Sequence, residues 1–307
     1  MEHQEEAYDY DMQCTKPITL FKVGKVSYPN GLEVPCGKCL ACRQKIRKEW
    51  SLRMYHELSQ HEDSVFLTLT YDDEHLPEND SLVKDHIVLF MKKLRRYLDA
   101  EDRKIKYFAV GEYGDKKERP HYHLIVFGLG LKEEDRLKVV KAWKHCDWDN
   151  EAIRKKSFGT VEPASIDYVA QYINKKFSGR LAEDDYAKRG REPVFRLMSY
   201  GLGKEYALAN ADRITADLSI RYQGKDVSIP RYYCKLLKID PELLKSKALE
   251  ADQELVEKIT GVYLSRELLY LSGDVEMNVN VIKRTQAGKA QHDKNLQARL
   301  DIHSKKL

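Results

Sequence analysis

Two histidines, His121 and His123, are the residues whose type and spacing point most directly to chemistry. In an extended strand alternate side chains share a face, so the His-x-His spacing directs both imidazoles to one place. The polar run 114–120 is typical of a return loop after a strand at 107–113, and that hairpin brings Glu112 close to both histidines. A carboxylate with two imidazoles suits a divalent cation such as Mg²⁺ or Mn²⁺. The three residues predict a metal site, against the alternative of a chance His-x-His pair on a strand.

The strand that carries the histidines has apolar residues on both faces. One face is predicted to hold His121, His123, Ile125 and Phe127, and the other Tyr122, Leu124 and Val126. This pattern indicates a central strand covered on both sides. Two imidazoles buried in such a strand need polar partners or a metal.

Tyr168 and Tyr172 are spaced for a second kind of chemistry. They lie four residues apart in a predicted helix over 163–177, which places both phenols on one face, with Lys175 and Lys176 about one turn further on. A phenol with a pKa of about 10 attacks phosphate effectively only where cations favour the phenolate. The alternative is a pair of core aromatic residues, which is the commoner reason for this spacing.

The metal site and the tyrosines together predict cleavage of a DNA strand. A divalent ion would polarise the scissile phosphate and hold it in line with a phenol. The expected products are a 5′-phosphotyrosine and a free 3′-hydroxyl, and reversal of the reaction rejoins ends. A second tyrosine on the same face would cut the next copy of the site.

The cysteines predict a further metal site. Cys36, Cys39 and Cys42 follow a CxxCxxC spacing, and a preceding hairpin is expected to carry Cys14 to them as a fourth ligand of a structural zinc. The alternative is a set of thiols that caps a helix.

Basic residues gather in two predicted helices, 40–58 and 82–98. Each cluster either contacts DNA phosphates or forms the solvated face of an amphipathic helix. The residues expected to bind DNA are Arg43, Lys45, Arg47, Lys48, Lys92 and Lys93.

The composition is that of a globular protein with a highly charged surface. Charged residues make up 33% of the 307 residues and hydrophobic ones 42%, with a net charge of +4. No apolar run reaches the length of a membrane span, and the acidic start has no signal-peptide pattern, so we expect a cytosolic protein. The chain has no GxxxxGK[ST] loop, so strand unwinding is expected to come from another protein.

The remaining elements follow from periodicity and turn residues. We expect a strand at 19–28 that turns at Pro29-Asn30-Gly31 into 32–34, and a loop from Phe195 that leads into a helix at Gly203. The other expected strands lie at 64–71, 157–161 and 226–229, and the other expected helices at 133–143, from 230, and over most of 241–307.

Three segments resemble, in order and spacing, the motifs of HUH-superfamily rolling-circle replication initiators: FLTLTYDDEHLP, GEYGDKKERPHYHLIVFG and YVAQYINKKF. The segments VPCGKCLACR, FRLMSYGLGKEY and IPRYY extend the likeness to initiators of small single-stranded DNA phages of the microvirus type. The resemblance covers about residues 14–237. It implies the metal ligands Glu112, His121 and His123, the nucleophiles Tyr168 and Tyr172, and the accompanying Lys175 and Lys176.

The resemblance also implies the architecture. The expected fold is α+β, with a central antiparallel sheet that carries the His-x-His strand and is flanked by helices, including the two-tyrosine helix. We expect a disordered acidic tail at 1–13, a nicking and joining domain at 14–238 whose segment 14–42 is rich in cysteine, and a helical extension at 239–307.

The implied function is initiation of rolling-circle replication in the host bacterial cytoplasm. The expected partners are single-stranded or supercoiled DNA at the origin and a host helicase, with no membrane. A plasmid initiator or single-strand transposase would use the same chemistry. A non-catalytic zinc-containing DNA-binding module, with the tyrosines in its core, is the alternative of another class.

Overall fold

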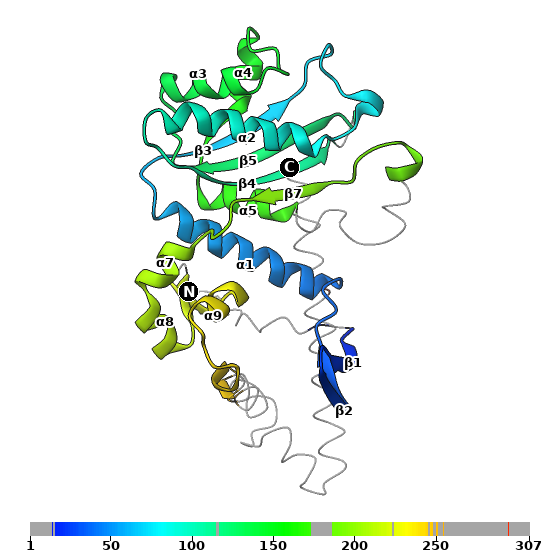
Figure 1. The fold of residues 1–307 in the computed structure, drawn as a ribbon, viewed down its shortest axis with the longest axis vertical. Coiled ribbons are helices and arrows are strands. Elements are labelled where there is room, and N and C mark those ends of the chain that lie inside the picture. The colour runs from blue at the N-terminus through cyan, green and yellow to red at the C-terminus, as the bar shows by residue number, and fades with distance from the viewer. Residues whose placement is uncertain are drawn as a thin grey trace, which may run out of the picture. The chain divides into compact units, whose positions relative to one another are not determined.

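A five-stranded antiparallel sheet with the order β6-β3-β5-β4-β7 lies at the centre of the protein (Figure 1). Strand β5, which carries both histidines, is the middle strand and pairs with β3 and β4. The prediction of an α+β fold with the His-x-His strand at the centre of an antiparallel sheet is therefore confirmed. The strands are β3 (Ser64–Thr70), β4 (Lys106–Tyr113), β5 (Pro120–Phe127), β6 (Phe158–Thr160) and β7 (Phe195–Met198).

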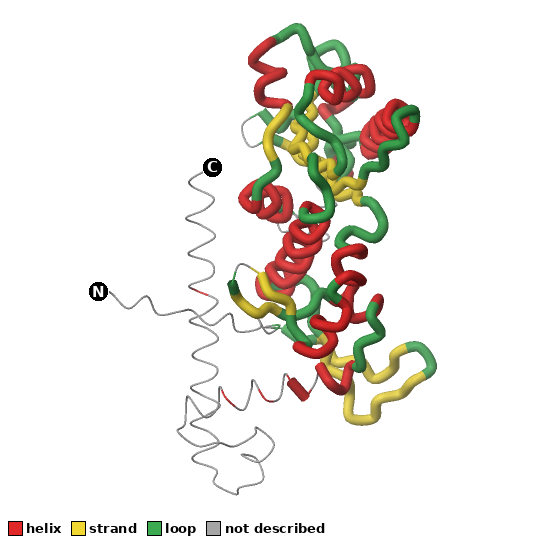
Figure 2. Tube along the Cα trace, turned by 90° about the vertical axis from the view of Figure 1, so that its left-hand side faces the viewer, coloured by secondary structure: helices red, strands yellow, loops and turns green. Residues whose placement is uncertain are grey.

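The computed structural model describes residues 14, 16–114, 117–172, 186–222 and 224–244, together with 246, 247, 250, 254 and 294. These residues form two compact units, 1–211 and 212–307. Helices, strands and loops of the described residues are distinguished by colour in Figure 2. The acidic start at 1–13 and most of 239–307 lie outside the described residues, so the expected tail and extension stay predictions.

One face of the sheet packs against α2 (Lys84–Asp99), α3 (Glu133–Ala142) and α4 (Glu151–Ser157) (Figure 1). Helix α2 is amphipathic, so its apolar residues at helical spacing face the sheet. Tyr122, Leu124 and Val126 of β5 are buried in this core beside Phe90 and Trp143. The face expected to carry these three β5 residues is confirmed.

The other face packs against α1 (Leu40–Leu58) and α5 (Pro163–Gln171) (Figure 1). Ile125 and Phe127 of β5 are buried here with Met54 of α1 and Val169 of α5. Helix α5 begins with a capping box formed by Glu162 and Ser165 and has proline in its first turn. This face also carries His121 and His123, because they alternate with Tyr122 along the strand.

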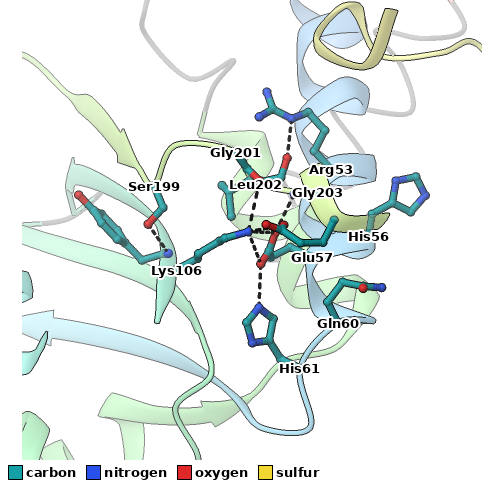
Figure 3. A network of polar contacts seen from close by, with 12 residues as sticks. Arg53, His56, Glu57, Gln60, His61, Lys106, Ser199, Gly201, Leu202 and Gly203 are labelled. Carbon is teal, nitrogen blue, oxygen red and sulfur yellow. Dashed lines mark hydrogen bonds and ion pairs between the residues drawn. The ribbon is translucent and has the colours of Figure 1, made fainter. Parts of the chain in front are cut away.

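A buried carboxylate, Glu57, fastens the end of α1 to this unit (Figure 3). It accepts hydrogen bonds from the Gly203 amide at 2.7 Å and from Lys106 Nζ at 3.1 Å, and its other oxygen lies 2.7 Å from His61 Nε2. Burial alone would raise the pKa of Glu57, but these partners outweigh it and lower the pKa. The network joins α1, the start of β4 and the loop before α7 (Lys204–Ala209).

The N-terminal hairpin turns earlier than expected. It consists of β1 (Ile18–Val23) and β2 (Val26–Val34), with Val23 paired to Val26 across a two-residue turn that starts at Gly24. Gly24 has φ +60°, which suits the first position of such a turn. The expected turn at Pro29-Asn30-Gly31 is wrong, since these residues lie inside β2. Gly31 is needed there because a Cβ would collide with the methyl group of Thr19.

Residues 195–198 form edge strand β7 rather than the expected loop, and they pair with Phe108–Gly111 of β4. The apolar alternation there is too short to distinguish a strand from a loop. Helix α4 and strand β8 (Ile220–Tyr222) were also not expected. The short 3₁₀ helix η1 (Glu78–Asp80) lies in the loop after β3.

The second unit contains α8 (Ala211–Asp217), a hairpin of β8 and β9 (Lys225–Val227), and α9 (Arg231–Leu236). The strand expected at 226–229 overlaps β9, and the helix expected from Pro230 is α9. Among the described residues, no helix is long and apolar enough to cross a membrane.

Candidate metal and nucleophile site

Glu112, His121 and His123 meet on the α1/α5 face of the sheet. Glu112 lies directly opposite His121 in the β4–β5 ladder, so the two side chains point the same way. Glu112 Oε1 lies 2.7 Å from His121 Nε2 and 3.2 Å from His123 Nε2. One potential ligand atom from each residue lies within 4.8 Å of the others. The structure thus brings the predicted triad together as a candidate metal-binding group.

The outer nitrogens of both imidazoles have hydrogen-bond partners. His123 Nδ1 lies 3.1 Å from Thr68 Oγ1, and His121 Nδ1 lies 3.2 Å from the Arg119 carbonyl oxygen. Such partners fix the ring orientation and leave Nε2 directed at the centre of the site, as in protein metal sites generally.

The charge state of Glu112 suits a cation. Burial would raise the pKa of Glu112, but hydrogen bonds and charge interactions with His121 and His123 outweigh it and lower the pKa to about 2. The carboxylate is therefore anionic at neutral pH. With two imidazole nitrogens beside it, it offers the mixed oxygen and nitrogen donors that Mg²⁺ and Mn²⁺ accept.

Tyr168 and Tyr172 lie beside the histidines. The ring of Tyr172 stacks on His123 with centroids 5.6 Å apart, and Tyr168 meets the same imidazole edge-on at 5.3 Å. The two phenol rings are 5.0 Å apart, and Phe66 contacts both Tyr168 and His123. The predicted pair therefore faces the triad, although Tyr172 also contributes to the core of this face.

The phenol of Tyr172 is held neutral in this arrangement. Burial raises its pKa above the ordinary value, and hydrogen bonding with Tyr168 and the negative charge of Glu112 raise it further. A phenolate at this position would need a compensating positive charge nearby.

Helix α1 holds the tyrosine helix in place. Ser51 Oγ donates a hydrogen bond of 2.8 Å to Asp167, the residue before Tyr168. The charge of Asp167 also acts on the half-buried guanidinium of Arg47, whose pKa burial lowers and Asp167 raises. A polar contact next to the first tyrosine thus supplements the apolar α1–α5 interface.

The basic residues expected to bind DNA fall into two groups. Arg43, Lys45, Arg47 and Lys48 lie on α1, on the same face of the sheet as the triad, and Lys45 is exposed. Lys92 and Lys93 are exposed on α2, on the opposite face. The two groups therefore do not form one surface around the site. Lys175 and Lys176 lie outside the described residues, so their role stays a prediction.

The four cysteines also come together. Cys14, Cys36, Cys39 and Cys42 place their sulfur atoms within 4.8 Å of one another, as a second candidate metal-binding group. The paired ends of β1 and β2, Ile18 opposite Val34, bring Cys14 to Cys36, as expected of a preceding hairpin.

Sequence reasoning missed Thr68, Phe66 and Asp167. Thr68 lies opposite His123 in the β3–β5 ladder, and Phe66 follows on the same face. The register between strands so distant in sequence decides these contacts, and no local pattern gives that register. Asp167 carried one usable signal, its position next to a tyrosine already singled out.

Known proteins match this chain over most of its length. A family model of replication-associated proteins of the ORF2 group matches residues 64–177, which include the triad and both tyrosines. The Replication-associated protein ORF2 of Spiroplasma virus 4 is 32% identical over 276 residues, 82% of this chain and 84% of the relative. The Replication-associated protein VP4 of Bdellovibrio phage phiMH2K is 34% identical over 246 residues, 72% of this chain and 76% of the relative.

A third relative is longer. The Replication-associated protein ORF4 of Chlamydia phage 1 is 36% identical over 227 residues, which are 71% of this chain and 55% of the relative, so this chain spans about half its length. The N-terminal nuclease domain of the minute virus of mice non-structural protein 1 matches 66% of each chain at 14% identity. Its TM-score of 0.17 is too low to support an argument. By its likeness to the first two relatives, the chain belongs to the family of phage replication-associated proteins.

Proposed function

We propose that this protein initiates rolling-circle replication of a phage genome by nicking single-stranded DNA at the origin through a tyrosine, and later rejoins the ends. The observation that carries the proposal is the contact of two tyrosines with the imidazole of His123, itself beside Glu112 and His121. Membership of the phage replication-associated family supports a role in replication.

The side chains of the triad fit a divalent cation. Glu112 supplies an anionic oxygen, and two Nε2 atoms converge on it because Thr68 and the Arg119 carbonyl engage the outer nitrogens. We propose Mg²⁺ or Mn²⁺ as the ion. When bound, the ion supplies Lewis-acid polarisation of the scissile phosphate and charge that favours a nearby phenolate.

The two tyrosines supply the nucleophile. The phenol oxygen of one attacks phosphorus, the bond to the 3′-oxygen breaks, and the leaving strand takes up a proton to become a free 3′-hydroxyl. The tyrosine keeps the 5′-phosphate, so the energy of the broken ester is conserved. Since both rings contact His123, the second tyrosine is placed to cut the next copy while the first holds the strand.

Further groups would complete the reaction. Lys175 and Lys176, which follow the second tyrosine, are proposed to stabilise charge on phenolate or phosphate. A host helicase is proposed to separate the strands, because the sequence has no phosphate-binding loop of the GxxxxGK[ST] kind.

The test is covalent capture of DNA. The protein is incubated with Mn²⁺ and a pool of random single-stranded oligonucleotides that carry a 3′-fluorophore, and denaturing gels report a protein–DNA adduct. We expect an adduct with the wild type, adducts with Tyr168→Phe and with Tyr172→Phe, and none with the double variant. Mass spectrometry of the adduct identifies which tyrosine carries the 5′-phosphate.

The control is Tyr97→Phe on α2, which removes an exposed phenol on the opposite face of the sheet and should cut like the wild type. A non-catalytic DNA-binding module predicts no adduct with any variant and equal DNA affinity in all of them. An adduct that persists in the Tyr168→Phe/Tyr172→Phe double variant would assign the nucleophile elsewhere.

A further inference from the structure

A second centre lies in the same unit as the triad, at the start of α1. It consists of Cys14, Cys36, Cys39 and Cys42, and nothing in the proposed nicking chemistry uses it. We propose that these four cysteines hold a structural zinc ion that fastens the β1–β2 hairpin to the first turn of α1.

The sulfur positions fit one tetrahedral ion. Zinc–sulfur bonds of about 2.3 Å in a tetrahedron place sulfur atoms about 3.8 Å apart. The Sγ atoms of Cys14 and Cys39 are 3.8 Å apart, and all four sulfur atoms lie within 4.8 Å of one another. A disulfide requires about 2.05 Å, so Cys14 and Cys39 are not joined in this way.

The backbone around the cluster is arranged for thiolates. The amide of Cys36 donates to Cys14 Sγ at 3.2 Å, and the amides of Lys38 and Cys39 donate to Cys36 Sγ at 3.4 and 3.2 Å. Gly37 has φ +70°, which turns the chain so that these amides point at sulfur. Amide donors directed at sulfur stabilise negative charge there, as a metal-bound thiolate needs.

The alternative of thiols that cap the helix does not describe the first of them. Cys39 occupies the N-cap position of α1, yet its side chain makes no capping hydrogen bond. Its sulfur is directed at Cys14 instead. Cys42 lies in the first helical turn, three residues on, so both sulfurs reach the same point from one end of the helix.

The hairpin gives the ion a mechanical role. An isolated two-stranded hairpin is at best marginally stable, and β1 is largely exposed, with Phe21 64% accessible. Cys14 and Cys36 lie just outside its paired ends, so a shared ion would close the open end of the hairpin onto α1. Because α1 also bears Ser51, which binds Asp167, the ion would fix the start of the helix that supports the tyrosines.

The first measurement is metal content after exhaustive dialysis. It is made on the His121→Ala/His123→Ala double variant, so that a metal at the triad does not contribute. We expect about one tightly bound zinc per chain. Adding Cys36→Ser should remove it, while adding Cys234→Ser, which changes a cysteine outside the cluster, should not.

The second measurement serves if Cys36→Ser fails to fold. Reconstitution of the double histidine variant with Co²⁺ should give the intense visible and thiolate charge-transfer bands of a tetrahedral sulfur site. Hydrogen exchange should then show faster exchange in 16–46 when zinc is stripped by chelator, and no change in β3 and β5.

Three results would overturn the proposal: no tightly bound metal, a metal that survives Cys36→Ser, or iron in place of zinc, since iron also accepts a tetrahedral set of four sulfurs. None of these readouts uses DNA cleavage. A failure here would leave the nicking proposal standing, and a protein that holds zinc without cutting DNA would separate the two in the other direction.

Discussion

Two carboxylates of this protein, Glu57 on α1 and Glu112 on β4, have histidine partners and lowered pKa values, yet their surroundings differ. Glu57 is surrounded by groups that donate: the Lys106 ammonium, the Gly203 amide and His61 (Figure 3). Glu112 lies between two imidazole nitrogens of the neighbouring strand. Both sites would attract attention on pKa alone.

The difference separates a structural ion pair from a ligand set. A lysine cannot bind a metal cation while it is protonated, and a backbone amide cannot do so at all, so the partners of Glu57 saturate it. Imidazole Nε2 is itself a metal ligand, and the outer nitrogens at the triad are already engaged. The kind of partner, more than burial or pKa, thus identifies Glu112 as the functional carboxylate.

The largest effect is expected at the histidines of the triad. Replacing His121 or His123 by alanine removes one of three proposed ligands, so the rate of adduct formation should fall by at least about 1000-fold, or about 4 kcal/mol. Urea unfolding should show that the fold persists, and Mn²⁺ should raise the melting temperature of the wild type only. His75→Ala, which removes an imidazole outside the triad, is the matched control. Undiminished cutting by His121→Ala would remove the triad from the mechanism.

The next effect should appear at Glu57 and concern stability alone. Glu57→Gln leaves Lys106 without its buried partner, which should cost about 3 kcal/mol in the free energy of unfolding. Below the unfolding transition, Mn²⁺ affinity at the triad should equal that of the wild type, because the bonds of Glu57 go to Lys106, His61 and Gly203. The measurement pairs urea titration with Mn²⁺ binding by calorimetry. Equal loss of metal affinity and stability would contradict the assignment of separate roles.

Acid should reveal the charge of Glu112. In the metal-free protein its pKa of about 2 lies below the ordinary 4.5, so the unfolded chain binds more protons between these values. Its contribution is present above about pH 4.5 and lost as the pH falls toward about 2. The stability difference between wild type and Glu112→Gln should therefore shrink by about 2 kcal/mol from about pH 5 to about pH 2. Glu62→Gln, an exposed site, should show a constant difference.

The sequence predicted the triad because its geometry is local. A hairpin of strands at 107–113 and 120–128 suffices to place Glu112 opposite His121, and period-two alternation places His123 beside it. The bounds predicted for α1 agree with the structure at both ends, since its apolar residues recur at helical spacing.

What the sequence did not predict depended on distant pairing or on a close choice between turns. The β1–β2 hairpin offered two turn signals, and the glycine of the two-residue turn at Gly24 outweighed Pro29-Asn30-Gly31. Edge strand β7 forms because β4 offers an unpaired edge, which only the assembled sheet provides. The hydrogen bonds of Thr68 and Ser51 join residues 55 and 116 positions away.

The smallest effect, at Thr68, tests whether the triad is oriented from outside. Thr68→Val keeps the shape of the side chain but removes the oxygen that lies 3.1 Å from His123 Nδ1, so the imidazole loses the partner that directs Nε2 at Glu112. Mn²⁺ affinity should fall by about 10-fold, or about 1.4 kcal/mol, as for other outer partners of metal ligands. Thr68→Ser should restore most of it, and Thr70→Val, on the same face opposite His121, is the control without a bond to either imidazole in the described contacts. If Thr68→Val bound Mn²⁺ as tightly as the wild type, the orientation of His123 would have to come from its packing between Phe66 and Tyr172. The contrast with Glu57 would then rest on ligand type alone.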